Sequence, residues 1–273
     1  MDNYECKQQE TIALTEKPKT EYNYYYMRQN IAVHNGNDYC VFWSENPNGY
    51  QDFNYLKAGK IDRNGKWIIT PQNIYEKQLK NVHIDDFAFC KTNKKETILA
   101  FSERIEDKKS VVIYKIDKNL NIRDSITLRD SLDFSPKYLL KRDKTYLLLA
   151  EVYHNSNNVQ LYYRLLNDNL TPKTDFIKLA NNINLVEKPI LTSEGFMASW
   201  IDSDLSDNFL RSVLISKSGK QSNIINMPNH TRPTQFYNVE FDKNHVDIYL
   251  FYHGENLVET LIRKRINKKE YEL

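Results

Sequence analysis

The strongest constraint on the fold is a short apolar segment that ends in a polar residue and occurs five times along the chain. The five copies span residues 38–45, 97–103, 146–151, 196–202 and 248–253. Their last residues are Glu45, Glu103, Glu151, Asp202 and His253, and successive copies are spaced by roughly 50 residues. A repeat of this length that holds several short strands is typical of a β-propeller.

Each copy is flanked by further strand and turn signals. A first strand precedes the apolar segment, at 30–34, 85–90, 136–141, 189–192 and 237–242. A third strand follows it and ends in a tight turn such as Asp62-Arg63-Asn64-Gly65 or Ser216-Lys217-Ser218-Gly219. Asn-Gly and Ser-Gly steps between alternating segments indicate hairpins. A fourth strand closes each unit, at 67–70, 125–128, 176–179 and 223–226. The sequence therefore predicts an all-β fold built from four-stranded antiparallel blades.

The fifth repeat lacks a fourth strand of its own. The N-terminal segment Thr11–Thr15 (TIALT) is similar to the fourth strands of the other units. We expect it to complete the last blade and close the ring, which removes the open sheet edges of a linear array. The prediction is a five-bladed β-propeller formed by one domain, residues 1–273, with residues 1–10 as a loose leader. Six blades is the alternative if residues 1–30 contribute more than one strand.

Composition and motifs exclude several classes of protein. Charged residues are 27% of the chain and balance to +2, without the basic excess of a nucleic-acid binder. No apolar run approaches the length of about 18 residues that a membrane span needs. The chain has no GxSxG, HExxH, Walker or GxGxxG motif, and we expect no cofactor.

The three cysteines, Cys6, Cys40 and Cys90, have no metal-binding spacing, so we expect no metal site. Cys40 and Cys90 fit buried strand positions, and a disulfide between them is the alternative for an exported chain. No signal peptide is visible in residues 1–20. The chain as written fits the cytoplasm, and the periplasm or cell envelope if a signal was removed.

Two sets of residues are predicted to meet on one face. In a propeller the first strands line the axis, and the loops before them share a face with the ends of the second strands. The first set precedes the first strands: Arg28, Asp85, Asp86, Asp133, Glu187 and Arg232. The second set ends the second strands: Glu45, Glu103, Glu151, Asp202 and His253. The face is expected to be mostly acidic, with two arginines.

The repeats resemble those of sialidase-like propellers and of five-bladed furanosidases such as arabinanases. The segment from Asp62 to Trp67 resembles a degenerate Asp-box of the sialidase superfamily, a structural hairpin motif. The segment Val186-Glu187-Lys188-Pro189 resembles the furanosidase motif that carries the general acid. The resemblance implies that Glu187 is an acid, that Asp133 tunes it, and that Arg28 or Arg232 clamps a substrate. The first blade, however, has Arg28-Gln29-Asn30 where the furanosidase base would stand.

These patterns favour a non-catalytic binding protein over an enzyme. Loops on a rigid scaffold carry recognition, and an acidic face attracts a partner with a basic surface. We expect a protein partner, and a toxin-neutralising immunity protein would fit a compact propeller without catalytic motifs. The alternative is a glycoside hydrolase of the furanosidase or sialidase type, or a degenerate relative that binds a glycan without cutting it. A fold alone does not decide between them, because strand-end carboxylates also serve as turn caps.

Overall fold

The computed structural model describes residues 26–35, 38–46, 54–77, 82–92, 96–105, 108–155, 158–202, 210–227, 233–241, 245–253 and 259–267. Their regular secondary structure consists of β-strands, which confirms the predicted all-β class. Across these ranges, no helix has the length and hydropathy that crossing a bilayer requires.

The strands form five antiparallel sheets, each made from consecutive segments of the chain. The first contains β1 (Tyr26–Asn35), β2 (Asp38–Asn46), β3 (Asn54–Ile61) and β4 (Trp67–Lys77). The second contains β5 (Val82–Lys91), β6 (Thr97–Ile105), β7 (Lys108–Ile116) and β8 (Ile122–Leu128). The third contains β9 (Phe134–Arg142), β10 (Thr145–Asn155), β11 (Asn158–Asn167) and β12 (Ile177–Ala180). The fourth contains β13 (Ile183–Leu191), β14 (Gly195–Asp202), β15 (Leu210–Ser216) and β16 (Ile225–Met227). The fifth contains β17 (Pro233–Phe241), β18 (His245–His253) and β19 (Glu259–Asn267).

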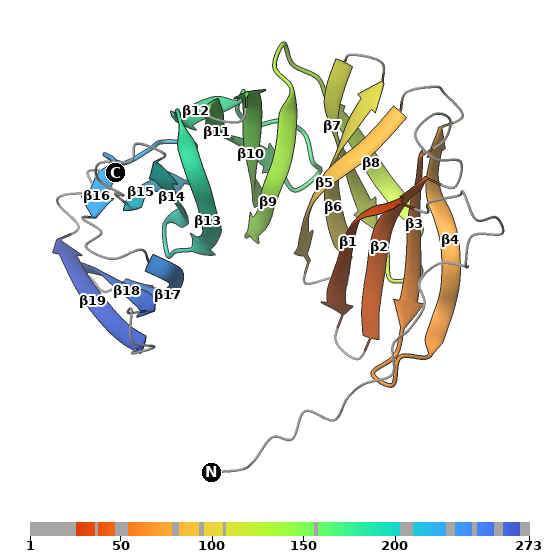
Figure 1. Ribbon diagram of the computed structural model, residues 1–273, viewed down its shortest axis with the longest axis horizontal. Helices are drawn as coiled ribbons and strands as arrows, with labels where there is room; N and C mark the ends of the chain where they lie inside the picture. Colours follow the sequence, from red (N-terminus) through yellow and green to blue (C-terminus); the bar gives the residue numbers. More distant parts are fainter. Residues whose placement is uncertain are drawn as a thin grey trace.

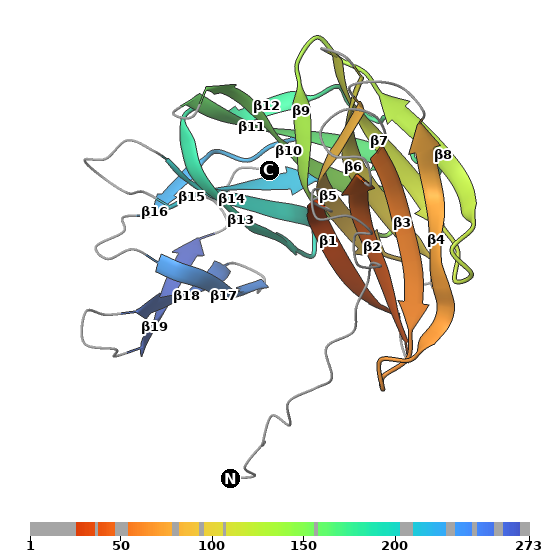
Figure 2. The same cartoon turned by 45° about the vertical axis from the view of Figure 1, so that its right-hand side comes forward.

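The sheets follow one another around an axis, as Figures 1 and 2 show. The first strands β1, β5, β9, β13 and β17 lie on the inner side, and contacts join β1 to β5, β5 to β9, β9 to β13 and β13 to β17. This is the predicted β-propeller arrangement, and the five sheets agree with the predicted repeats. Thr11–Thr15, which we expect to close the ring, lies outside the described residues. Ring closure, and the choice between five blades and six, therefore remain predictions.

The hydrophobic core lies between neighbouring sheets, and it explains the repeated apolar segment. In β10, Leu148 packs in the core between the second and third sheets, whereas Leu147 and Leu149 pack in the core between the third and fourth. Successive side chains of a strand point to opposite faces, so a strand buried on both faces reads as a continuous apolar run. The second strand β6 follows the same rule, with Ile98 on one face and Leu99 on the other.

The turns between third and fourth strands are locally capped. The Asp62 Oδ1 atom accepts hydrogen bonds from the backbone N–H groups of Asn64 (2.8 Å) and Lys66 (2.9 Å). Asp117 accepts the same two bonds in the next sheet, from Asn119 at 2.8 Å and Asn121 at 2.9 Å. Aspartate is suited to this place because its short side chain reaches its own backbone two residues on. The Asp-box-like segment therefore has a structural role, as the resemblance implied.

Cys40 and Cys90 form no disulfide and are buried in different cores. The structure therefore favours the small buried hydrophobe over the alternative of a disulfide between them. Burial raises the pKa of the Cys90 thiol to about 12, against the opposing charge of Lys141. Such a thiol stays protonated and chemically inert at neutral pH.

Candidate functional site

The first strands begin earlier than the sequence analysis expected. β5 starts at Val82 and β13 at Ile183, so Asp86 and Glu187 lie within strands and not in the loops before them. The error has a physical cause, which is a β-bulge in each of these strands. The pairing register of β5 shifts between Asp85 and Ala88, and that of β13 shifts between Glu187 and Ile190. A bulge interrupts the alternation of the strand and re-aims a side chain, so the segment before it does not read as a strand.

Asp86 occupies the β5 bulge with a backbone φ of 55°. Aspartate is one of the few residues other than glycine that tolerate this conformation. The Asp86 Oδ2 atom lies 3.0 Å from Lys109 Nζ and accepts a hydrogen bond of 3.1 Å from Ser102 Oγ. Burial alone would raise the pKa of Asp86, but the charge and hydrogen bond of Lys109, with the serine hydroxyls, lower it below 3.8. Asp86 is thus held as a carboxylate.

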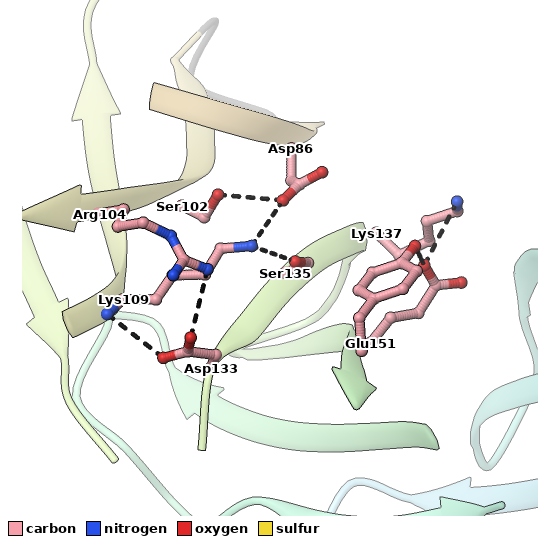
Figure 3. Close-up of polar contacts among 9 residues, drawn as sticks. Asp86, Ser102, Arg104, Lys109, Asp133, Ser135, Lys137 and Glu151 are labelled. Atoms are coloured by element: carbon pink, nitrogen blue, oxygen red, sulfur yellow. Dashed lines mark hydrogen bonds and ion pairs between the residues drawn. The ribbon is translucent and has the colours of Figure 1, made fainter. Parts of the chain in front are cut away.

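Lys109 joins Asp86 to the third sheet, as Figure 3 shows. Its Nζ also donates a hydrogen bond to Ser135 Oγ on β9, and its backbone N–H donates to Asp133 Oδ1 at 3.3 Å. The Asp133 Oδ2 atom lies 3.2 Å from the Arg104 guanidinium. Asp133 precedes β9, as predicted, and is 44% exposed. Lys109 therefore contacts carboxylates of two adjacent sheets, Asp86 through its ammonium and Asp133 through its backbone N–H.

Glu151 is placed by β10 and is only 4% exposed. The Tyr153 hydroxyl donates a hydrogen bond to its Oε2 atom, and Lys137 Nζ lies 3.6 Å from the same oxygen. The Tyr153 side chain itself is 52% exposed. Burial, then the hydrogen bond and charge of Glu151, raise the pKa of Tyr153, and the charge of Asp86 adds to this rise. A buried carboxylate therefore fixes the orientation of an exposed ring.

Glu187 completes the group from the fourth sheet. Burial raises the pKa of Glu187 above 4.5. The neighbouring Tyr138 hydroxyl donates to the Val186 carbonyl at 3.4 Å. Burial raises the pKa of Tyr138 too, and the charges of Glu187 and Glu151 raise it further. Through these shared neighbours, the structure links Asp86, Asp133, Glu151 and Glu187 from three consecutive sheets. We call these four residues the carboxylate cluster.

Two further predicted residues lie apart from these contacts. Burial raises the pKa of Glu103, and the charge of Arg129 opposes this rise. Burial also raises the pKa of Tyr114 to about 12, with a further contribution from the charge of Glu103. Glu103 thus faces the core between the first two sheets, to which Tyr114 belongs. Asp202 lies 2.7 Å from Arg211 and accepts a hydrogen bond of 3.1 Å from the Trp200 indole. Its role in this geometry is to satisfy a buried tryptophan.

The remaining predicted residues stay untested. Arg28, Glu45, Asp85 and His253 lie in β1, β2, β5 and β18, but their side chains are outside what the structure describes. Arg232 lies outside the described residues altogether. Where side chains are described, no group of three or more His, Cys, Asp or Glu residues is placed to hold a metal ion.

The sequence analysis missed the cations that accompany the carboxylates. Lys109 and Arg104 pair with each other across the β6–β7 hairpin, and Arg211 pairs with Trp200 across the β14–β15 hairpin. A signal was present for Arg211, because Asp202 ends one strand of its hairpin, Arg211 is near the start of the next, and the two form an ion pair. The partners of Arg104 and Lys109 are Asp133 and Asp86, which lie outside the β6–β7 hairpin, so the charges of that hairpin did not indicate them.

Comparisons with known proteins agree with the fold. The structure is similar to the subtype N10 neuraminidase-like protein of A/little yellow-shouldered bat/Guatemala/060/2010, at 12% identity and a TM-score of 0.50, over 88% of this chain and 80% of that chain. It is also similar to an exo-β-1,3-galactanase from Clostridium thermocellum, at 14% identity and a TM-score of 0.46, over 88% and 70% of the two chains. An α-L-arabinofuranosidase from the same organism matches at 10% identity and a TM-score of 0.45, over 72% and 71%.

The chain has a β-propeller fold similar to that of the neuraminidase-like protein. This likeness agrees with the sialidase-like propeller fold that the repeats predicted. Neither a protein-family model nor a curated protein sequence matches the chain. At such low identity the likeness establishes the fold alone, and the activities of those proteins do not carry over.

Proposed function

We propose that this chain is a non-catalytic binding protein, and that it binds a protein partner with the face that carries the carboxylate cluster and Tyr153. The observation that carries the proposal is the Tyr153–Glu151 hydrogen bond, which holds an exposed aromatic ring in one orientation. Tyrosine is enriched among the residues that dominate binding energy at protein interfaces. A ring that is already oriented loses little conformational freedom on binding, which favours affinity.

The charged residues around Tyr153 support a binding face. Arg104, Asp133 and Lys137 are each about 40% exposed or slightly more, so they remain accessible to a partner. A ring surrounded by accessible charged groups matches the usual anatomy of an interface, which has a buried centre and a polar rim. Because Arg104, Lys109 and Lys137 balance the carboxylates locally, the face is of mixed charge. We therefore expect a partner surface with both basic and acidic groups. The sequence alone had led us to expect a mainly basic partner surface.

The same ion pairs favour binding over catalysis. A general base must be able to take up a proton near the working pH. The Lys109 ammonium holds Asp86 ionised within the second sheet, and the Arg104 guanidinium of that sheet engages Asp133, which precedes β9 of the third. A toxin-neutralising immunity role is the finer form of this proposal, with the toxin as the partner of mixed charge.

The test compares variants of two exposed tyrosines at opposite ends of the sheets. Tyr153→Ala removes the oriented ring near the end of the second strand β10. Tyr39→Ala is the matched control, because Tyr39 is 36% exposed and lies near the start of the second strand β2. Affinity capture from the source organism identifies the partner, and titration with the purified partner gives the affinities. We expect Tyr153→Ala to weaken binding by about 2 kcal/mol or more, roughly 30-fold, and Tyr39→Ala to leave it unchanged. Equal affinities for Tyr153→Ala and wild type would overturn the proposal.

A glycoside hydrolase is the second candidate, and one observation favours it. The pKa of Glu187 is raised, whereas that of Asp86 is lowered. Two carboxyl groups whose environments separate their pKa values are the usual signature of an acid and its partner in glycoside hydrolysis. In this candidate Glu187 is the acid and Asp133 tunes it, as the furanosidase resemblance implied.

The enzyme candidate has its own test. Wild type and Glu187→Gln are incubated with arabinan, galactan and sialylated oligosaccharides, and the released reducing sugar is measured. Turnover by wild type that falls at least about 100-fold in Glu187→Gln would establish it in place of the binding protein. Binding of one of these glycans without cleavage would instead indicate the degenerate glycan-binding relative.

A further inference from the structure

A cavity lies at the opposite end of the first strands from the carboxylate cluster. Its volume is about 290 Å³, and it is lined by Lys91, Lys141, Arg142, Asp143 and Leu191. Lys91, Arg142 and Leu191 are the last residues of β5, β9 and β13, the three inner strands whose other halves carry the cluster. At about 3.3 Å per residue, Lys91 lies roughly 16 Å along β5 from Asp86, Leu191 roughly 13 Å along β13 from Glu187, and Arg142 roughly 30 Å along the chain from Asp133. This cavity is therefore independent of the proposed binding face.

Two of the cavity's charges are matched by ion pairs. Lys141 Nζ lies 2.5 Å from Asp168 Oδ1, on the turn between β11 and β12. Asp143 Oδ2 lies 2.7 Å from Lys217 Nζ, on the turn after β15. The single acidic lining residue is thus already occupied by a lysine from the next sheet, and the Lys141 charge is already neutralised.

The other two cations, Lys91 and Arg142, form no ion pair among the described residues, although the charge of Arg142 contributes to lowering the pKa of Asp143. Lys91 is exposed, and no carboxylate in the described part of the chain lies within ion-pair distance of it. The Arg142 Nη2 atom donates to the Ser193 carbonyl at 3.2 Å, which positions the guanidinium. Its Nε atom is buried and finds no acceptor among the described residues, so part of its hydrogen-bonding capacity is unused. The cavity therefore carries two positive charges in excess of the acidic groups around it.

We propose that this cavity binds a phosphate-type oxyanion, between Lys91 and Arg142. Two unmatched cations fit the charge of a doubly negative group, and arginine is well suited to phosphate because its planar donors match the oxygens. A volume near the lower end of the usual range for ligand pockets admits the oxyanion with a small attached group. Inorganic phosphate and a small phosphomonoester share this chemistry.

The experiment measures binding to the full-length chain by isothermal titration calorimetry at constant ionic strength. The probes are inorganic phosphate, glycerol 3-phosphate and, as a control anion, chloride. We expect both phosphate probes to bind and chloride not to, with affinity falling at least about tenfold in Lys91→Gln and in Arg142→Gln. Lys118→Gln is the control, because Lys118 is exposed on a different turn and lines a different cavity. Tighter binding of glycerol 3-phosphate than of inorganic phosphate would identify a phosphomonoester as the source.

Two results would overturn the proposal. One is binding of phosphate that Lys91→Gln and Arg142→Gln leave unchanged, and the other is chloride binding as well as phosphate at matched ionic strength. Lys91→Gln alone decides the case if Arg142→Gln does not fold, because the Lys91 side chain is exposed. Tyr153→Ala should retain phosphate binding. Loss of phosphate binding therefore tests this proposal, and loss of partner binding tests the proposed function.

Discussion

Lys109 Nζ lies 3.0 Å from Asp86 Oδ2 and donates a further hydrogen bond to Ser135 Oγ, so one ammonium group joins the third strand of one sheet to the first strands of two. The Lys109 side chain is only 11% exposed. Its charge is therefore largely removed from water, and its attraction to Asp86 is stronger than that of a surface pair. This contact fixes the bulge that presents the carboxylate cluster.

Replacing Lys109 by methionine tests this role in stability. The change keeps the length of the side chain but leaves Asp86 without its cation, and we expect the free energy of unfolding to fall by about 2–4 kcal/mol. Urea unfolding followed by circular dichroism measures the loss. Lys108→Met, on the exposed neighbouring residue, is the control and should change stability by less than about 0.5 kcal/mol. In the double variant with Asp86→Asn, part of the loss should be recovered; simple additivity would argue against a direct pair.

The pH dependence of stability reports on Asp86 independently. Its folded-state pKa lies below the ordinary value of 3.8, since the Lys109 charge and hydrogen bonds outweigh burial. The unfolded state therefore binds a proton more readily, so this contribution is complete above 3.8 and is lost as the pH falls through the folded-state pKa. We expect Asp86→Asn to be less stable than wild type at neutral pH, with a difference that shrinks on acidification. Asp175→Asn is the control because Asp175 is fully exposed, and a difference that does not change with pH would contradict the mechanism.

Glu187 should show the opposite sign. Burial raises its folded-state pKa above 4.5, so folding disfavours the charged form. Stability therefore falls as the pH rises from 4.5 through the folded-state pKa. We expect Glu187→Gln to be more stable than wild type at neutral pH, and the gain to vanish below about pH 4. Thermal unfolding across this range measures it. A variant that is less stable at neutral pH would show that the carboxylate itself holds the fourth sheet, and would weaken the acid role of the enzyme candidate.

The repeat was predictable because the second strands are buried on both faces. Neighbouring residues are both fully buried on β6 (Ile98 and Leu99) and on β10 (Leu148 and Leu149). Such strands appear in the sequence as continuous apolar segments between polar ones. The turn signals were equally local, since Asp62 and Asp117 cap their own backbones. Local patterns of this kind need no knowledge of the neighbouring sheets.

The site was predictable only in part. The position of Asp133 before β9 was expected, but the placement of Asp86 and Glu187 inside strands depends on bulges that have no simple sequence signature. The pairing of Asp86 with Lys109 and Ser135 spans two sheets, and such a contact depends on how the sheets pack. Sequence spacing could therefore indicate which carboxylates lie at one face, but not which of them are neutralised there.

The last prediction concerns the turns between the third and fourth strands, in which one residue has a positive φ. This residue is glycine in two turns, Gly65 (φ 80°) and Gly219 (φ 94°), and leucine in two others, Leu120 (φ 67°) and Leu170 (φ 65°). Both leucines are almost fully buried, at 2% and 1% exposure, so their packing offsets the backbone strain.

An alanine at position 219 would have the strain without that compensation. Its Cβ would lie 3.0 Å from Thr174 Cγ2 in a conformation that favours glycine. We expect Gly219→Ala to lower the free energy of unfolding by about 1–2 kcal/mol in urea, and Lys220→Ala, on the exposed next residue, to change it by less than about 0.5 kcal/mol. Gly219→Asn should lose less than Gly219→Ala, because asparagine tolerates positive φ. Equal losses for the two variants would show that the contact with Thr174, and not the backbone conformation, sets the requirement for glycine.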